Sequence, residues 1–421
     1  FPDVNLRFKK DSDYRVVRKH NKVRKAIFSL KNQPRDKSQV ETIQYLLGRG
    51  KHKKTSEHSQ LAVDLKTAKG KTYCALAYLK YIKHVGAIIC SGLLRQWMER
   101  ALEHTTLLRS QIYKIKGSKS IEKILEEDNP NHKLYIMSIE TLRSWGKRNG
   151  WNNLNKLFQH LGVGSKFYDE AHKNFDTMLK VDSYTNVKKT IYLSFSMKRS
   201  NRKENKVFKN AFDHVPFYGR ELTTEEDIYL DGLLIKFDTN PDTEAKTYCK
   251  TNRGFNAHNY EKHMLWDHTN STNYFKALEF AVEKVLNNEG KGAFLFSTNN
   301  MIEHVKSYLE SKYEDIEIGI YTSLVKKKIR YKELDNKIIL STPKSFGEGK
   351  DVKDLCFITV CLPYSSPVYM EQIPGRVRPI EGRNQAYMEL HNTGFSSIKR
   401  QLRRRKKIMK KILKTIYIKT L

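Results

Sequence analysis

Short runs of β-branched and aromatic residues recur along the chain, and helix-like stretches separate them. In the first half the runs are "LAVDL" from Leu61, "VGAIIC" from Val85, "LYIM" from Leu134, "KFYD" from Lys166 and "IYLSFS" from Ile191. They resume with "GAFLFS" from Gly292, "IEIGIY" from Ile316, "KIILST" from Lys337 and "LCFITVCL" from Leu355. Strands that alternate with helices in this way form parallel sheets flanked by helices. The sequence therefore predicts an α/β fold with two domains in tandem.

The length of the chain supports two domains. Its 421 residues exceed the size at which one hydrophobic core stops growing. The interval 197–262 is polar and irregular, so it contains the linker, and we place the boundary near residue 225. The predicted parts are a basic N-terminal extension, two α/β domains and a basic amphipathic C-terminal helix, at residues 1–33, 34–225, 226–397 and 398–421.

The charge of the chain indicates the kind of partner. Lys and Arg number 78 against 46 Asp and Glu, a formal charge of +32 that favours nucleic acid first and an anionic membrane second. No run of about 18 apolar residues predicts a membrane span. In the C-terminal segment, apolar residues fall on one helical face and Lys and Arg cover the rest. Such a helix can lie on a membrane, but we favour packing on the second domain with contact to DNA.

The cysteines indicate a reducing compartment. Five cysteines are present, an odd number, and none has C-x-x-C spacing. Four of them lie in apolar runs, as reduced core cysteines do. We expect an intracellular, cytoplasmic protein.

The stretch "KTAKGKTY", residues 66–73, has three features of a phosphate-binding loop. Gly70, Lys71 and Thr72 supply a glycine, a lysine for the outer phosphates and a hydroxyl for Mg²⁺. Leu65 stands where the full pattern has its first glycine. A strand-like run precedes the loop and helical spacing follows it, as the motif requires. The alternative is a lysine-rich turn that binds no ligand.

Two adjacent acids form a second motif, "FYDEAHKN" at residues 167–174. Asp169 and Glu170 come at the end of an apolar run, where ligands bind in α/β sheets. We expect Asp169 to hold Mg²⁺ through its water shell and Glu170 to orient and deprotonate the water that attacks the γ-phosphorus. The alternative is an acidic helix start.

The third motif is "QIPGRVRP", residues 372–379. Arg376 and Arg378 can place positive charge on a phosphoryl group in its transition state. The alternative is a solvated basic turn, which does not explain why loop, acids and arginines follow in this order, each after an apolar run.

At this point the sequence resembles the superfamily-two helicases of the DEAH-box type, ATP-driven motors in which two RecA-like domains clamp ATP. "TAKGKT" is similar to their motif I, "DEAH" to motif II, "SFS" at 194–196 to motif III and "QIPGR" to motif VI. "PRDKSQ" from Pro34 resembles the Q motif, "ICSGLLRQWMERA" motif Ia, "IMSIETL" the next strand-binding motif, "FLFST" motif IV and "STPKSFGEGKDV" motif V. The resemblance runs from about Pro34 to about Pro379. Within the superfamily it is nearest to phage branch-migration helicases of the UvsW type.

The resemblance implies a role for each matching residue. The catalytic residues are Glu170, Gln372, Arg376 and Arg378. The residues that bind ATP are Gln39, Thr67, Gly70, Lys71, Thr72, Asp169, Gly349 and Asp351, of which Thr72 and Asp169 serve Mg²⁺. The residues that contact nucleic acid are Arg95, Trp97, Thr141, Ser297 and Thr342. The residues that couple hydrolysis to nucleic acid are His172, Ser194 and Ser196, with His172 bonded to Gln372.

Two positions depart from the family pattern. Ala68 stands where many relatives have glycine, and Arg378 comes two residues after Arg376 where the commoner spacing puts the second arginine at Pro379. The second arginine finger is therefore Arg378 or absent. Trp97 and Trp145 can stack on bases, but a Trp after a strand is more often a core residue.

The expected function is an ATP-dependent DNA helicase or translocase that uses Mg²⁺ and acts, as a monomer, on branched or forked DNA in branch migration, recombination or repair. The alternatives are a double-stranded DNA translocase, an RNA helicase and, from another class, a basic nucleic-acid binder that does not hydrolyse ATP.

Overall fold

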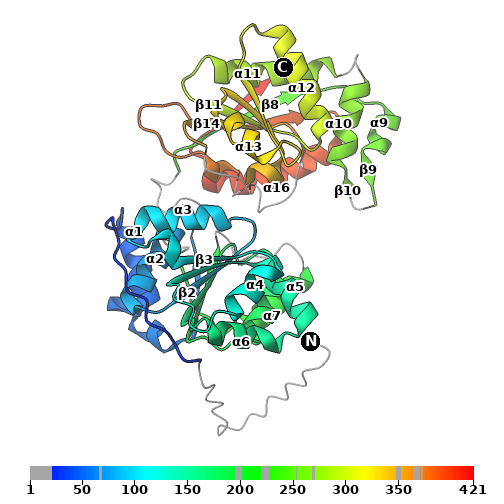
Figure 1. The fold of residues 1–421 in the computed structure, drawn as a ribbon. Helices are drawn as coiled ribbons and strands as arrows, with labels where there is room; N and C mark the ends of the chain where they lie inside the picture. Colours follow the sequence, from blue (N-terminus) through cyan, green and yellow to red (C-terminus); the bar gives the residue numbers. More distant parts are fainter. Residues whose placement is uncertain are drawn as a thin grey trace. The chain divides into compact units, whose positions relative to one another are not determined.

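The computed structural model of the protein describes residues 21–65, 69–194, 202–219, 228–252, 254–267, 271–347, 352–363, 370 and 373–421. The chain forms two compact units, the first built mainly from Lys71–Met197 with Phe1–Val63, the second mainly from Gly219–Leu421. Figure 1 shows them in the blue-to-green and green-to-red parts of the colour scale. Five residues with predicted roles, namely Thr67, Ser196, Gly349, Asp351 and Gln372, lie outside the described residues.

Within the described residues, the first unit is built on a sheet of seven strands in the order β3-β4-β2-β5-β6-β1-β7. Their bounds are β1 Gln60–Asp64, β2 Gly86–Cys90, β3 Ile112–Ile115, β4 Leu134–Ser138, β5 Ser165–Tyr168, β6 Lys189–Ser194 and β7 Phe217–Tyr218. The pairs β1–β7, β2–β4, β2–β5, β3–β4 and β5–β6 are parallel. The carboxyl ends of these strands therefore meet at one edge of the sheet.

The described part of the second unit has a sheet of seven parallel strands in the order β12-β13-β11-β14-β15-β8-β16. Their bounds are β8 Asp231–Phe237, β11 Lys291–Leu295, β12 Ile318–Tyr321, β13 Ile338–Ser341, β14 Leu355–Val360, β15 Ala386–Asn392 and β16 Ile416–Thr420. Apart from the small antiparallel pair β9 Lys250–Thr251 and β10 Gly254–Phe255, the strands follow one another as in the first unit. Numbered along the chain within each unit, both sheets have the order 3-4-2-5-6-1-7. The tandem α/β fold predicted from the sequence is confirmed, as two domains of one topology.

Helices cover these sheets. In the first unit they are α1 Lys37–Leu47, α2 Lys71–Ile82, α3 Leu94–His104, α4 Ser118–Leu125, α5 Ile139–Asn149, α6 Asn152–His160 and α7 Phe175–Ser183. Those that follow are α8 Arg202–Ala211, α9 Thr243–Tyr248, α10 Ala257–Trp266, α11 Thr272–Leu286, α12 Asn299–Lys312, α13 Lys327–Arg330, α14 Pro343–Gly347 and α16 Ser396–Ile412. Side-chain caps define several starts: Asp36 accepts from the Gln39 N–H at 2.9 Å, and Thr298 accepts from the Met301 N–H at 3.2 Å. No helix in the described part of the chain is both long and apolar enough to cross a bilayer.

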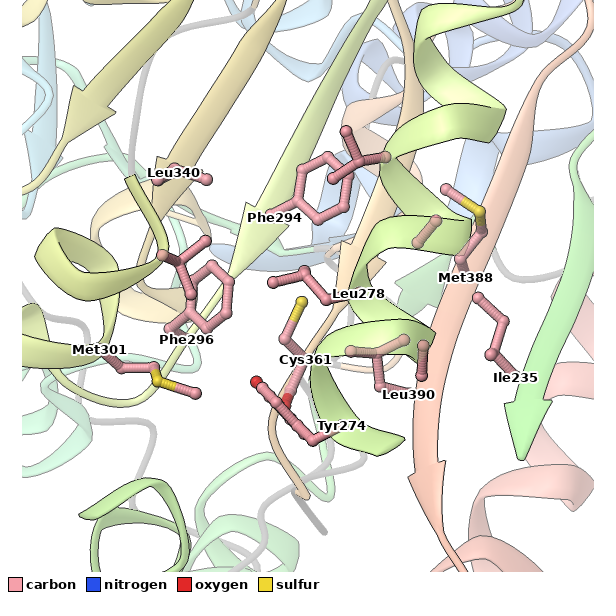
Figure 2. Packing of buried hydrophobic residues seen from close by; sticks show 14 of the residues in the cluster. Ile235, Tyr274, Leu278, Phe294, Phe296, Met301, Leu340, Cys361, Met388 and Leu390 are labelled. Atoms are coloured by element: carbon pink, nitrogen blue, oxygen red, sulfur yellow. The ribbon is translucent and has the colours of Figure 1, made fainter. Parts of the chain in front are cut away.

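The second sheet is buried on both faces. Along β11, Phe294 and the following Phe296 belong to one hydrophobic cluster, whereas Ala293 and Leu295 belong to the other. Figure 2 shows the first cluster, where helix α11 lays Tyr274 and Leu278 against the strands. This double burial explains why the strands read as continuous apolar runs. The five cysteines are buried and unpaired, as predicted.

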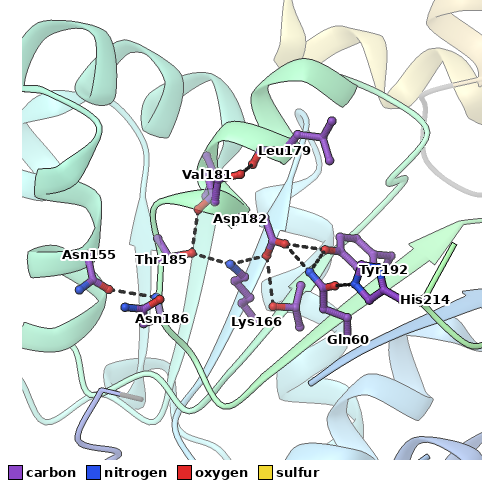
Figure 3. Close-up of polar contacts among 12 residues, drawn as sticks. Gln60, Asn155, Lys166, Leu179, Val181, Asp182, Thr185, Asn186, Tyr192 and His214 are labelled. Atoms are coloured by element: carbon purple, nitrogen blue, oxygen red, sulfur yellow. Dashed lines mark hydrogen bonds and ion pairs between the residues drawn. The ribbon is translucent and has the colours of Figure 1, made fainter. Parts of the chain in front are cut away.

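A buried polar network ties three strands of the first unit together (Figure 3). Lys166 on β5 has no exposed surface, and its Nζ lies 2.6 Å from Asp182 Oδ1 on α7. Asp182 Oδ2 accepts hydrogen bonds from Tyr192 on β6 and from Gln60 on β1, both at 2.7 Å. The three strands that precede the predicted motifs I, II and III are therefore held in register by one carboxylate.

Of the two terminal segments, the C-terminal one differs from its predicted organisation. The described part of the N-terminal extension packs on the first unit, because the Arg24 side chain donates to the Leu161 and His132 carbonyls at 3.1 and 3.0 Å. The C-terminal helix predicted over residues 398–421 ends at Ile412, and β16 follows and pairs with β8. The β-branched residues in "TIYIKT" favour a strand, which the helical spacing upstream concealed.

Candidate functional site

The site is built at the carboxyl edge of the first sheet, where the loop after β1 leads into α2. Gly70 has φ +76, a conformation that suits glycine, and Lys71 is the first residue of α2. Lys71 and Thr72 are partly exposed, whereas the next seven residues of the helix are buried. The first turn of this helix presents backbone N–H groups and the positive end of the helix dipole, which suit an anion.

Asp169 and Glu170 follow β5, at the same edge of the sheet. The Asp169 N–H donates to the Ile89 carbonyl at 2.9 Å, which extends the β5–β2 ladder by one residue. Glu170 then has φ +51, a strained value for a residue with a side chain. Its N–H donates to Asp169 Oδ1 at 3.0 Å. The chain turns sharply here, so the two carboxylates have different surroundings.

Trp97 supplies the other contact of the Asp169 carboxylate. Its indole Nε1–H donates to Asp169 Oδ2 at 2.7 Å. Trp97 is 3 % exposed and lies on the buried face of α3 with Leu94, Met98 and Ala101. This burial favours the core interpretation of Trp97 over the base-stacking one. Both oxygens of Asp169 are thus oriented by N–H groups.

The electrostatics of Asp169 suit a cation ligand. Its pKa is raised to about 6, mainly by desolvation and then by the neighbouring Glu170 charge, against the lowering effects of the Trp97 hydrogen bond and the Lys71 charge. Lys71 and Asp169 are 98 positions apart in the sequence (169 − 71). The effect of the Lys71 charge on the pKa of Asp169 shows that motif I and motif II interact electrostatically in the folded unit. A partly desolvated carboxylate beside a second acid is under-neutralised, and a divalent cation corrects this.

Residues that fit Mg²⁺ and a triphosphate are therefore present. The described residues contain no cluster of three or more His, Cys, Asp or Glu that could enclose a metal. Mg²⁺ needs no such cage, since it commonly binds through one or two carboxylates, water and substrate phosphates. Asp169 and the Thr72 hydroxyl are the protein groups that could hold it.

Glu170, His172 and Ser194 form a chain of contacts beside these acids. His172 Nδ1 lies 3.2 Å from Glu170 Oε2 and 2.9 Å from Ser194 Oγ. Ser194, the last residue of β6, is fully buried. The predicted motif II and motif III residues are therefore in direct contact in the first unit.

Gln39 also lies next to the motif I helix. It is 4 % exposed, and its Oε1 accepts from the Arg35 N–H at 2.8 Å. The Cys74 thiol on α2 lies 3.9 Å from the Gln39 carbonyl. The Q-motif segment thus packs on α2, although the side-chain oxygen of Gln39 is bonded within its own loop.

The residues predicted to contact nucleic acid have varied surroundings. Arg95 is exposed and paired with Glu99 at 2.6 Å. Thr141 is buried, and its Oγ1 accepts from the Gly117 N–H at 2.8 Å. Thr342 Oγ1 lies 3.1 Å from Ser345 Oγ and accepts from the Ser345 N–H, so it caps α14.

Ser297 depends on a buried acid that the sequence did not reveal. The Ser297 and Thr298 N–H groups donate to Glu261 Oε1 and Oε2, at 2.5 and 2.7 Å. Desolvation raises the pKa of Glu261 to about 7 against the effect of these bonds. Glu261 lies on α10, and nothing in its local sequence marks it. The predicted finger residues Arg376 and Arg378 are both partly exposed, at and just after the short 3₁₀ turn Pro374–Arg376.

Glu140 is a second residue that the sequence analysis missed. Its carboxylate accepts from Ser91 Oγ at 2.6 Å and from Ser138 Oγ at 2.7 Å, and Asn174 Nδ2 lies 3.5 Å away. These partners belong to the segments predicted as motif Ia, the next motif and the end of motif II. It lies within the segment "IMSIETL", three residues after the apolar run that ends at Met137, and the sequence gives no other signal for it.

Comparison with solved structures identifies the fold. S. cerevisiae Dbp5 bound to RNA and ADP BeF3 matches with a TM-score of 0.59 and 14 % identity, over 91 % of this chain and 89 % of that one. The Pyrococcus furiosus Hef helicase domain matches with a TM-score of 0.52 and 13 % identity, over 88 % and 98 %. The chain has the two-domain fold of superfamily-two helicases.

The finer branch of the resemblance has no such support. The match to T4 UvsW covers 94 % of this chain and 79 % of the UvsW chain at 14 % identity. Its TM-score of 0.35 is too low to assign this chain to the UvsW type. The sequence matches no protein-family profile and no curated protein. These likenesses therefore establish the fold alone.

Proposed function

We propose that this chain is an ATP-dependent nucleic-acid motor, a helicase or translocase of superfamily two. The observation that carries the proposal is the effect of the Lys71 charge, at the helix start after β1, on the Asp169 carboxylate, which Trp97 orients at the end of β5. The helicase fold supports the same conclusion.

The residues of the first unit divide the work of hydrolysis. Lys71 neutralises the outer phosphates, and the α2 start provides N–H donors for them. Asp169 and Thr72 hold Mg²⁺, which when bound neutralises charge on the phosphates. Glu170 orients the attacking water and takes its proton. His172 contacts both Glu170 and Ser194, and it transmits the state of this acid to β6 through Ser194.

Other roles rest on the motif resemblance alone. We propose Arg376 and Arg378 as arginine fingers and Gln39, Thr67, Gly70, Gly349 and Asp351 as further nucleotide contacts. Gln372 and Ser196 are proposed to act with His172 in coupling. Arg95, Thr141, Ser297 and Thr342 are proposed to contact nucleic acid, mostly through phosphates and independently of sequence.

For the track we propose DNA, with branched or forked DNA as the preferred form and branch migration, recombination or repair as the process. The structure of Dbp5 contains RNA, so RNA is the second candidate. We further propose a monomer in the cytoplasm that has no membrane partner, because Leu402, Met409 and Leu413 of the C-terminal apolar stripe are buried in the second unit.

The test is phosphate release by wild type and Lys71→Ala, with forked DNA, Holliday-type DNA, blunt duplex, single-stranded DNA or RNA, or without nucleic acid. We expect nucleic acid to stimulate the wild-type rate and Lys71→Ala to abolish it. Strand-displacement assays on the forked, Holliday-type and duplex substrates then identify the nucleic acid along which the protein moves. A chain that binds nucleic acid but releases no phosphate is a binding protein, and this result would overturn the proposal.

A further inference from the structure

We infer that the exposed face of α16 is a binding surface for the phosphate backbone of nucleic acid, an inference that rests on the proposed function. Every charged residue from Ser396 to Leu421 is Lys or Arg. The exposed ones on the helix, which we call the basic face, are Lys399, Arg400, Arg403, Arg404, Lys407, Lys410 and Lys411. At 100° per residue they span about 140° of the helix circumference. The helix thus carries one continuous cationic strip.

The opposite side of α16 is fixed against the second unit. Leu402 and Met409 belong to one core cluster of this unit and Ile398 to the other. Between them, Arg405 is 3 % exposed and donates to both oxygens of Glu389 on β15, with distances of 3.0 to 3.2 Å. Tyr387 completes this contact, donating to Glu389 Oε1 at 2.7 Å. A buried charge pair has directional geometry, so it sets the rotation of α16 and keeps the basic face outward.

Among the described residues, the basic face has no acidic counterpart. In the part of the chain that the structure describes, none of its members has a carboxylate within ion-pair distance. Like charges meet at helical spacing, as at Lys399 and Arg403 or Arg400 and Arg404, and each such pair costs about 0.2–0.5 kcal/mol. Helix α12 differs, because Lys306 pairs with Glu310 and Lys312 with Glu279. An anionic ligand would relieve the repulsion along α16.

The shape of the strip favours nucleic acid over a membrane. An amphipathic helix binds a bilayer by inserting its apolar face, and the apolar face of α16 is already buried. The 17-residue helix is about 25 Å long, which matches the rise of about seven nucleotides. A row of cations of this length suits a linear polyanion.

The test compares two variants that each lose three positive charges. Arg400→Gln/Arg404→Gln/Lys407→Gln changes the basic face, and Lys284→Gln/Lys306→Gln/Lys312→Gln is the matched control on α11 and α12. Binding of fluorescein-labelled single-stranded and duplex DNA is measured by anisotropy between 50 and 300 mM NaCl. Equal basal phosphate release and equal melting temperatures show that both variants are folded.

We expect the basic-face variant to lower the slope of log K against log salt by about 2 to 3 and to weaken binding about 10²-fold near 0.1 M salt, because each lost phosphate contact contributes about 0.7 to 0.9 to the slope. The control should retain the wild-type slope. An unchanged slope in the basic-face variant, with wild type binding normally, overturns this inference and leaves the motor proposal intact. Absence of any nucleic-acid binding by wild type overturns both. Wild-type binding to phosphatidylserine vesicles that exceeds DNA binding, and is lost in the basic-face variant, would identify a membrane as the partner instead.

Discussion

Replacement of Trp97 by Phe tests how the metal-binding carboxylate is oriented. The change keeps an aromatic ring on the buried face of α3 but removes the indole N–H that lies 2.7 Å from Asp169 Oδ2. A hydrogen bond to a charged group contributes about 1.5–3 kcal/mol. If this energy holds the carboxylate in its metal-binding rotamer, its loss weakens Mg²⁺ binding by about 10- to 100-fold, as for other groups that orient metal ligands.

The assay is a Mg²⁺ titration of phosphate release at saturating ATP, with NMR of the indole N–H groups as a readout that does not depend on activity. We expect Trp97→Phe to raise the half-saturating Mg²⁺ concentration more than it lowers the maximal rate. The indole N–H resonance that is missing from the spectrum of Trp97→Phe belongs to Trp97. This resonance should shift from its wild-type position in Asp169→Asn.

Trp145 provides the matched control for this experiment. It is 8 % exposed in the same unit, and its indole nitrogen has no hydrogen-bond partner among the described residues. Trp145→Phe therefore removes a buried indole without removing a contact to Asp169. If Trp97→Phe and Trp145→Phe have the same Mg²⁺ dependence, Trp97 is only a packing residue and the reasoning is refuted.

Three further perturbations have defined outcomes. Arg376→Ala should lower the ATPase rate by about 10³ if Arg376 is a finger, and a loss below tenfold in steady-state assays excludes that role. Lys166→Met should lower the free energy of unfolding by about 3 kcal/mol in urea titrations, because it leaves Asp182 unpaired beside buried tyrosines, and an unchanged midpoint would show that the ion pair contributes nothing. The pKa of His391 is lowered to about 4, first by burial and then by Arg405 and nearby lysines, so folding excludes its proton and stability should fall as the pH drops from 6.5 toward 4. The expected loss of stability is about 3 kcal/mol, and His391→Gln should weaken this pH dependence in thermal melts. If the melting temperature of the variant falls with pH as steeply as that of wild type, another group causes the dependence.

The strands that could be predicted are those whose signal is local. β2, β11 and β14 are apolar on both faces because helices cover both sides, and such runs are visible in the sequence. β15 was not predicted, since Glu389, His391 and Asn392 interrupt its pattern although all three are buried. The Glu389 charge is compensated by Arg405, 16 positions away, and a contact of that kind has no local signature.

The same distinction applies to the site. The order of Lys71, Asp169 and Glu170 could be read from the sequence because phosphate chemistry constrains residue type next to strand ends. The partner of Asp169 could not, because Trp97 reaches it across 72 positions and the burial of α3 decides its direction. The common strand order of the two units could not be predicted either. The two units share a topology because their layers pack in the same way, and this requires no internal sequence repeat.

The most direct measurement of the central claim compares wild type with Glu170→Gln, in which the carboxylate that takes the water proton becomes an amide. Phosphate release and binding of a fluorescent ATP analogue are followed with and without forked DNA. The account predicts that the variant binds the nucleotide as wild type does but releases phosphate at least 10²-fold more slowly. Forked DNA should not stimulate this residual rate. Phosphate release at the wild-type rate by Glu170→Gln would contradict it.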